Sequence, residues 1–207
     1  MFSGIISELG RVKSMTPQGH EGIRFAIQFK STNHLVVGAS VAIDGVCLTV
    51  VRCVGDLVEF DAIPETLSKT TLGNLKVNHF VHVERALKMG DELGGHLVSG
   101  HVHGVGKVCS IDRAPFVLTV QVPHELSPYI FDKGFISLSG ASLTVVKALD
   151  QTFSVALIPE TLRATKFSEC HIGDLLNVEV DQTTKTTVDC IERSLESILI
   201  RKNLKRD

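Results

Sequence analysis

The chain has 207 residues, 43% of them apolar and 21% charged, a balance typical of a globular protein. Its net charge of −2 argues against a general nucleic-acid or anionic-membrane binder, because such partners need a basic face. No apolar run approaches the roughly 20 residues of a membrane span, and the sequence lacks the basic region of a signal peptide. The five cysteines include no CxxC pair. We therefore expect a reduced, soluble, cytoplasmic protein.

The first half of the chain has the pattern of a small all-β unit. Short apolar runs separated by Gly, Pro and Asn/Asp signals predict six strands: Gly4–Met15, Ile23–Phe29, Ser40–Ile43, Val46–Arg52, Leu57–Ala62 and Phe80–Glu84. The dipeptide Asp44-Gly45 predicts a two-residue hairpin turn with positive φ. A short helix is predicted over Glu65–Leu72, with Pro64 near its first position.

The second half predicts the same series of elements. Its six strands are His101–Ile111, Phe116–Val122, Phe135–Leu138, Ser142–Ala148, Thr152–Leu157 and Leu175–Val180. A hairpin turn is predicted at Ser139-Gly140, and a short helix is predicted over Glu160–Phe167. An amphipathic helix without a counterpart in the first half is then predicted over Thr187–Lys202, and its apolar stripe is expected to pack against other subunits. The stripe consists of Val188, Ile191, Leu195 and Ile198.

The two halves are copies of one domain. The five residues IPETL occur at Ile63–Leu67 and again at Ile158–Leu162, 95 positions apart (158 − 63), and the match extends over most of each half. We therefore predict two tandem six-stranded antiparallel Greek-key barrels in residues 1–95 and 96–186. Residues 187–207 are predicted to be the additional C-terminal helix.

One strand in each copy carries a candidate ligand-binding face. Side chains alternate along a strand, so Cys47 and Thr49 share the face opposite Leu48 and Val50. Ser142 and Thr144 repeat this arrangement in the second copy. Two small polar side chains beside a helix start suit a flat, polar ligand. The alternative is a solvated strand face, which is the commoner setting for Ser and Thr.

Three histidines lie in the glycine-rich stretch between the copies, at His96, His101 and His103. Their spacing is not a standard zinc pattern and no acidic or Cys ligand completes it, so we favour proton transfer over metal binding. Cys47 is a candidate reactive thiol. The chain contains no GxGxxG, GxxxxGK[ST] or HExxH motif.

Several of these stretches resemble one known family. MFSGII at the start of the chain, IDGVCLTV, ETLSKTTLG, ELGGHLVSGHVHG and the second IPETL occur in the order found in the riboflavin synthases of the alpha-chain type. The resemblance spans essentially the whole chain, and it implies a duplicated lumazine-binding barrel.

This resemblance implies an activity and an assembly. Such enzymes transfer a four-carbon unit between two molecules of 6,7-dimethyl-8-ribityllumazine, without cofactor or metal, and release riboflavin and 5-amino-6-ribitylamino-pyrimidinedione. Each barrel binds one lumazine, and the C-terminal helix gathers a homotrimer in which barrels of neighbouring subunits face each other. An assembly with lumazine synthase is a further expectation. Holding two rings in register supplies several kcal/mol, to order of magnitude, towards the barrier.

The family's site residues carry over onto this sequence. The first pocket is expected to contain Gly4, Ile5, Ile6, Ser40, Cys47, Leu48, Thr49, Ala62, Ile63, Pro64, Glu65 and Thr66. The second is expected to contain Gly100, His101, Val102, Lys133, Ser142, Leu143, Thr144, Ile158, Pro159, Glu160 and Thr161. The candidates for proton transfer and polarisation are His101, Cys47, Ser142 and His96, with Asp181 in support. Phe2 is expected to help close the first pocket, and a linker role is the alternative for His96.

The two copies differ at positions where the lumazine that donates the four-carbon unit and the lumazine that accepts it would need different contacts. Cys47 corresponds to Ser142, and Asp44 corresponds to Ser139, where an acidic residue is common in the family. This asymmetry favours catalysis. One alternative is a non-catalytic lumazine- or flavin-binding protein, since relatives of this kind keep the barrels and lose the chemistry. The other is a structural protein, which would not require the duplicated polar face.

Overall fold

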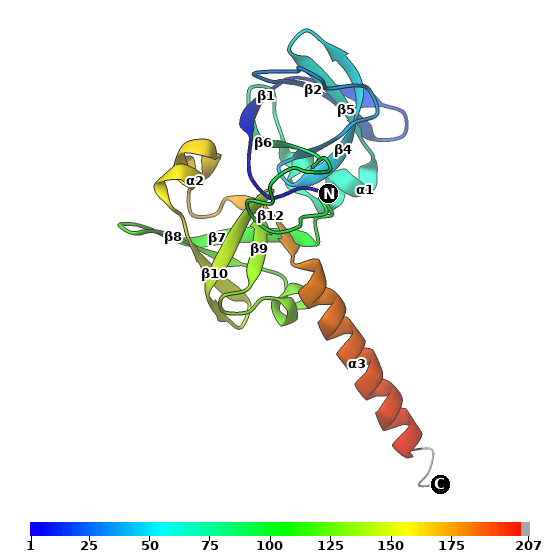
Figure 1. Cartoon of the computed structure of the whole chain (residues 1–207), viewed down its shortest axis with the longest axis vertical. Helices are drawn as coiled ribbons and strands as arrows, with labels where there is room; N and C mark the ends of the chain where they lie inside the picture. The colour runs from blue at the N-terminus through cyan, green and yellow to red at the C-terminus, as the bar shows by residue number, and fades with distance from the viewer. Residues whose placement is uncertain (204–207) are drawn as a thin grey trace.

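The computed structural model describes residues 1–203, with side chains to residue 199, and contains two stacked barrels and a projecting helix (Figure 1). The first barrel is closed in the order β1-β2-β5-β4-β3-β6. Its strands are β1 (Glu8–Gln18), β2 (Gly22–Gln28), β3 (Ser40–Ile43), β4 (Val46–Val54), β5 (Leu57–Ala62) and β6 (Phe80–Arg85). All its strand pairs are antiparallel. Closure leaves no open sheet edge on these short strands.

The second barrel repeats this topology in the closed order β10-β11-β8-β7-β12-β9. Its strands are β7 (Gly104–Arg113), β8 (Phe116–Gln121), β9 (Phe135–Leu138), β10 (Ala141–Leu149), β11 (Thr152–Ala156) and β12 (Leu175–Val180). The prediction of two six-stranded antiparallel barrels with a C-terminal helix is therefore confirmed. None of the helices in the described residues has both the length and the apolar character needed to cross a membrane.

Two predicted strands begin later than expected, and for the same reason. The strand predicted from Gly4 begins at Glu8, and the strand predicted from His101 begins at Gly104. In both cases the chain further upstream turns to the other barrel, where the Gly4 carbonyl accepts from the Ser142 amide and the Gly100 carbonyl accepts from the Cys47 amide. The segment predicted as helix in each copy divides into α1 (Pro64–Lys69) and η1 (Thr71–Asn74), and into α2 (Pro159–Ala164) and η3 (Lys166–Glu169). The short helix η2 (His124–Tyr129) was not predicted.

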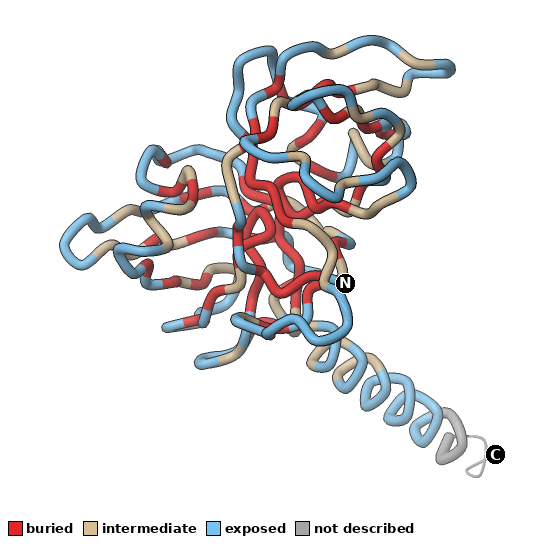
Figure 2. Tube along the Cα trace, turned by 45° about the horizontal axis from the view of Figure 1, so that its top comes forward, coloured by how far each residue is buried: buried red, intermediate tan, exposed pale blue. Residues whose placement is uncertain are grey.

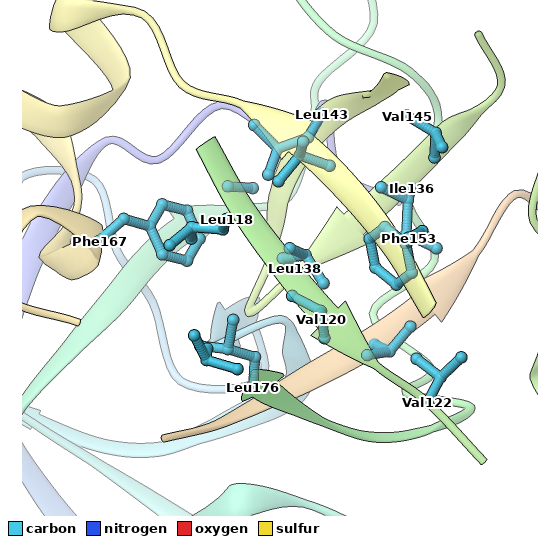
Figure 3. Packing of buried hydrophobic residues seen from close by; sticks show 14 of the residues in the cluster. Leu118, Val120, Val122, Ile136, Leu138, Leu143, Val145, Phe153, Phe167 and Leu176 are labelled. Carbon is cyan, nitrogen blue, oxygen red and sulfur yellow. The ribbon is translucent and has the colours of Figure 1, made fainter. Parts of the chain in front are cut away.

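Each barrel has its own apolar core, closed at one end by a residue of the short 3-10 helix. Figure 3 shows Phe167, fully buried, against Leu118 and the other apolar side chains of the second barrel. Leu72 occupies the equivalent place in the first barrel and is also fully buried. Burial extends from both cores into the region where the barrels meet (Figure 2).

The helix α3 (Gln182–Asn203) leaves the second barrel and extends away from both barrels (Figure 1). It begins at Gln182 rather than at the predicted Thr187, because Asp181 accepts hydrogen bonds from the Thr184 amide (2.7 Å) and hydroxyl (2.8 Å) and so caps its first turn. The last four residues of the predicted segment, 204–207, lie outside the described residues. Figure 2 shows the helix mostly exposed up to residue 199, with half-buried residues in its first turns.

A pair of equivalent side chains joins the two barrels. His82 of β6 donates from Nδ1 to the Ser139 carbonyl (2.8 Å) and accepts at Nε2 from the Lys166 amide (3.0 Å). Asn177 of β12, 95 positions further on (177 − 82), donates to the Asp44 carbonyl (2.8 Å) and accepts from the Thr71 amide (2.7 Å). The interface therefore has an approximate two-fold axis, and His82 must be neutral to make both bonds.

Among the described residues, one side of this interface contains an ion pair and the other does not. The buried Asp44 carboxylate binds the Lys166 ammonium at 2.6 Å and the His82 amide at 2.8 Å. The equivalent positions are Ser139 and Thr71, so the second side is uncharged. The difference in the sequence between Asp44 and Ser139 thus lies at the barrel interface, where it affects the contact between domains.

We expect the protein to lose stability as the pH falls below the ordinary pKa of histidine. Burial is the main cause that lowers the pKa of His82 from 6.5 to about 4. Between these values the unfolded chain binds a proton that the folded one excludes, so the free energy of unfolding decreases as the pH falls, by about 3 kcal/mol for this group. Urea unfolding at several pH values measures the decrease.

The matched variant for this experiment is His82→Asn, because Asn177 already makes the same two bonds at the equivalent position. It should fold and show a weaker dependence of stability on pH than the parent. An identical dependence in both proteins would mean that other groups are responsible. His96 and His103 are the first to consider, since burial lowers the pKa of each.

Candidate functional site

The polar strand faces predicted from the sequence are present in both barrels. In β4, Val46, Leu48 and Val50 are buried in the core, whereas Cys47 is half-buried and Thr49 is exposed. In β10 the same pattern holds for Ser142, which is half-buried, and Thr144, which is exposed. Leu48 and Leu143 face the cores, so among the predicted pocket residues they contribute backbone rather than side chains.

The predicted loop residues lie on open surface beside these strands. Ile63 and Ile158, which precede α1 and α2, are 61% and 63% exposed. Ser40 pairs with Thr49 across the β3–β4 ladder. The Lys133 amide, just before β9, donates a hydrogen bond to the Val145 carbonyl of β10 (2.8 Å). The remaining members of this group are buried Ala62, half-buried Thr66 and Thr161, and exposed Pro64, Glu65, Pro159 and Glu160.

The segments that precede the barrels exchange places. We call residues 2–6 the first glycine segment and residues 98–102 the second glycine segment. The Gly4 carbonyl accepts a hydrogen bond from the Ser142 amide (2.8 Å), and the Gly100 carbonyl accepts one from the Cys47 amide (2.9 Å). Ile6 packs in the core of the second barrel, and Val102 packs against the core of the first.

The contacts of the glycine segments differ from the grouping expected from the family. Gly4, Ile5 and Ile6 were assigned to the pocket of the first barrel, and Gly100, His101 and Val102 to that of the second. The structure places each segment at the pocket strand of the opposite barrel. Both glycines have positive φ, and a Cβ atom on Gly4 would lie 2.5 Å from Ser142 Cβ. Only glycine permits this close approach.

The turns of the two pocket strands meet at the two-fold axis. Asp44-Gly45 and Ser139-Gly140 have positive φ at both residues, as predicted for two-residue hairpins. A Cβ atom on Gly45 would lie 2.5 Å from the Gly140 amide nitrogen, so the turns pack backbone against backbone. The two pocket strands therefore start from one shared contact between the barrels.

The second pocket strand carries a serine–histidine pair. His96 is 6% exposed, and its Nδ1 lies 2.6 Å from Ser142 Oγ. The imidazole stacks on Phe135, with 5.1 Å between ring centroids and 13° between planes. Burial lowers the pKa of His96, an effect that the charge of Asp181 opposes. A neutral imidazole that is hydrogen-bonded to a hydroxyl can accept a proton near neutral pH.

The other candidates for proton transfer lie in different settings. His101 belongs to the second glycine segment; its side chain is exposed, and its amide donates to Ser99 Oγ (3.1 Å). Cys47 occupies the position equivalent to Ser142 but has no histidine at its side chain in the described residues. Asp181 caps α3, as described above, and reaches the site only through its charge on His96.

Two buried carboxylates next to the glycine segments were missed by sequence analysis. Glu84 and Glu179 are each 4% exposed, and each accepts hydrogen bonds from a serine and a glycine of one segment. Burial raises the pKa of both carboxyls, and the bonds from serine and glycine lower it. The repeated Val-Glu pair at 83–84 and 178–179, together with the repeated Ser-Gly pair, was the available signal.

The site residues do not coincide with the cavity between the barrels. That cavity has a volume of about 630 Å³ and is lined by residues of η1, η3 and the following turns, including Lys166 and Cys170. A second hollow of about 690 Å³ runs beside the first glycine segment at Ser3 and Ile5. In the described residues, no three His, Cys, Asp or Glu side chains are grouped so that they could hold a metal ion.

Comparison with known proteins identifies the family. The model of the lumazine binding domain matches twice, at residues 3–86 and 99–181. Riboflavin synthase of Chlamydia pneumoniae is 47% identical over 201 residues, which cover 95% of this chain and 98% of the relative. The chain belongs to the riboflavin synthase family.

Other relatives agree with this membership. Riboflavin synthase of Escherichia coli K12 is 40% identical over 200 residues, covering 94% of this chain and 93% of that protein. Among solved structures, LumP complexed with riboflavin superimposes with a TM-score of 0.81 at 26% identity, covering 88% of this chain and all of LumP. LumP complexed with 6,7-dimethyl-8-(1'-D-ribityl) lumazine gives a TM-score of 0.79 at 24% identity and shares the fold.

Proposed function

We propose that the protein is a riboflavin synthase, which transfers a four-carbon unit between two molecules of 6,7-dimethyl-8-ribityllumazine. The products are riboflavin and 5-amino-6-ribitylamino-pyrimidinedione. The observation that carries this proposal is the duplicated pocket strand, with Cys47 and Thr49 in one barrel and Ser142 and Thr144 in the other. Two copies of one binding face suit a reaction between two identical molecules. The identity of 47% to a riboflavin synthase supports the same reaction.

The unequal surroundings of the two faces support different roles for the two ligands. The His96–Ser142 pair polarises or deprotonates the ligand at the second barrel. His101 has the same role for the ligand at the first barrel, beside Cys47. The crossing of the glycine segments supports placing Gly4–Ile6 in the second subsite and Gly100–Val102 in the first. The remaining predicted residues of each barrel keep their assignment.

We infer that the working site forms between subunits of a homotrimer. In a single chain the pocket residues Thr49 and Thr144 are exposed, so a lumazine bound there keeps one face open. Along α3, Ile191 and Leu195 are both 55% exposed and Ile198 is 49% exposed. With Val188 they follow the alternating three- and four-residue spacing of a helix–helix seam. Packing of three such helices would bury this seam and bring neighbouring barrels together.

Replacing Leu195 with glutamate is expected to convert the trimer into monomers. Burial of one leucine contributes about 1.5–3 kcal/mol per copy, and a buried unpaired carboxylate opposes association. Light scattering after size exclusion measures the mass, and riboflavin formation should decrease with it. Ser197→Glu places the same charge outside the seam and should remain trimeric. A monomeric parent protein would contradict the prediction.

The remaining inferences concern location and further partners. All five cysteines are free thiols, which supports a reducing, cytoplasmic location. An assembly with lumazine synthase is proposed from the family resemblance. Its test is co-purification of the two proteins from the native cell.

The proposed activity is tested by mixing the purified protein with 6,7-dimethyl-8-ribityllumazine and a metal chelator, without added cofactor. Absorbance follows loss of lumazine and formation of riboflavin. Two lumazines consumed per riboflavin formed would support the dismutation. Spectral shifts of bound lumazine without riboflavin would instead favour a binding protein of the LumP kind, and no binding would favour a structural protein.

A further inference from the structure

Two buried glutamates occupy the same position in the two repeats. Glu84 lies on β6 and Glu179 on β12, the last strand of each barrel, and they are 95 positions apart (179 − 84). Each side chain is 4% exposed. Neither is paired with a cation among the described residues. A buried carboxylate is costly unless hydrogen bonds compensate for the lost water.

The compensation comes from a Ser-Gly pair in each case. Glu84 accepts hydrogen bonds at Oε1 from the Ser3 amide (2.6 Å) and the Ser3 hydroxyl (2.7 Å), and from the Gly4 amide (3.1 Å). Glu179 accepts from the Ser99 amide and hydroxyl (both 2.7 Å) and, at Oε2, from the Gly100 amide (3.0 Å). Every partner donates to the carboxyl oxygens, and an ionised carboxylate can accept all of these bonds. Bonds of this type are roughly twice as strong as neutral ones.

The same glycines contact the opposite barrel through their carbonyl groups. Glu84 belongs to the first barrel, but Gly4 binds the Ser142 amide of the second barrel at 2.8 Å. Glu179 belongs to the second barrel, but Gly100 binds the Cys47 amide of the first at 2.9 Å. Each peptide therefore joins a carboxylate of one barrel to the pocket strand of the other.

The glycines themselves provide no side chain to fix this position. Gly4 and Gly100 have φ values of +73° and +82°, and a Cβ atom on Gly100 would lie 2.6 Å from Cys47 Cβ. A flexible peptide that is packed this closely needs an external anchor if the pocket strand is to keep one geometry. The carboxylate is the charged group that supplies it.

We propose that Glu84 and Glu179 are positioning residues, each of which holds a glycine segment against the pocket strand of the opposite barrel. Each lumazine subsite is then shaped by a carboxylate of the barrel that does not contain it. The identity of the ligand rests on the proposed function, but the coupling between barrels does not. A structural role confined to each glutamate's own barrel would not produce the crossed pattern.

The first test measures the reactivity of the Cys47 thiol in the full-length protein. Cys53, Cys109 and Cys190 are replaced with serine so that Cys47 is the accessible thiol, since Cys170 is buried. In this background, Glu179→Gln should increase the rate of Cys47 alkylation by iodoacetamide at least fivefold, because an amide cannot accept all three bonds. Glu84→Gln should raise the rate by a smaller factor, because it acts on Cys47 only through Phe2, and Glu125→Gln at an exposed position should leave it unchanged.

Milder variants keep this test decisive if a glutamine variant folds poorly. Ser99→Ala removes one of the three bonds to Glu179 and should raise the alkylation rate in the same direction by a smaller factor. Ser3→Ala makes the equivalent change at Glu84 and should affect Cys47 less than Ser99→Ala does. Equal rates in the Ser99 and Ser3 variants, or a larger effect of Ser3→Ala, would overturn the proposal.

The second test measures lumazine binding and uses double variants. Combining Glu84→Gln with Ser142→Ala should give a dissociation constant that departs at least threefold from the product of the single effects. Combining Glu84→Gln with Cys47→Ser should depart less from the product of its single effects. The reverse pattern would overturn the proposal. If the protein forms no riboflavin, the proposed function fails, while the alkylation rates still report on the coupling.

Discussion

Replacing Phe2 with alanine is expected to lower the rate of riboflavin formation by about a hundredfold or more while both barrels stay folded. Phe2 is fully buried and packs with Val98, Ala42 and Cys47. Its amide and carbonyl form a two-bond bridge with Val98, at 2.8 and 3.0 Å. It therefore locks the two glycine segments together at the barrel interface rather than closing the first pocket alone.

The effect should be local because Phe2 lies outside the named strands of both barrels. Truncation of a buried phenylalanine costs about 3–5 kcal/mol, and the first glycine segment can detach without unfolding a barrel. Detachment removes the Gly4 carbonyl from the Ser142 amide. Steady-state rates and urea unfolding measure the two consequences separately.

Two control variants test whether the apolar packing of the Phe2 side chain causes the loss of activity. Phe2→Leu keeps most of the apolar volume and should retain much of the activity. Phe80→Ala, at a side chain that is 50% exposed, should change the rate little. Activity of Phe2→Ala within threefold of the parent would show that the bridge to Val98 is dispensable.

Replacing Gly100 with alanine is expected to weaken lumazine binding at the first barrel at least tenfold. The new Cβ atom would lie 2.6 Å from Cys47 Cβ, 2.9 Å from Phe2 Cε2 and 3.0 Å from the Cys47 amide nitrogen. Neither Cβ nor the amide can rotate away, so the pocket strand or the segment must move. Fluorescence titration with the lumazine measures affinity and the number of ligands per chain.

Gly55→Ala provides the matched control for backbone strain. Gly55 has a φ of +62°, and no atom lies within 4 Å of the added Cβ. The substitution should therefore cost only the roughly 1–2 kcal/mol of a left-handed backbone and leave binding unchanged. Two ligands bound per chain by Gly100→Ala, with the affinity of the parent, would contradict the steric argument.

The local pattern of the sequence determined the two barrels. Alternation in Val46–Val50 and Ser142–Val145 fixed which side chains enter the cores, because successive residues on a strand face opposite sides. Asp44-Gly45 and Ser139-Gly140 fixed the turns, because few residues adopt positive φ. The apolar spacing from Val188 to Ile198 predicted the exposed helix, although its start depended on the cap at Asp181.

The sequence also predicted individual site residues but not how they are combined. His96 and Ser142, 46 positions apart, were both candidates, and the structure places them 2.6 Å from each other. Their pairing depends on the path of the linker over the second barrel. The anchors Glu84 and Glu179 were missed, since one glutamate in a strand gives no periodic signal.

The exchange of the glycine segments was decided only by the tertiary structure. Hydrophobic periodicity reports which side chains are buried, and this determined the duplicated barrels, the pocket strands and the projecting helix. Gly4 and Gly100 contact Ser142 and Cys47 through backbone atoms, and glycine has no side chain whose pattern could reveal a partner. Which barrel each segment meets follows from the two-fold packing of the domains, which depends on long-range contacts such as His82 with Ser139.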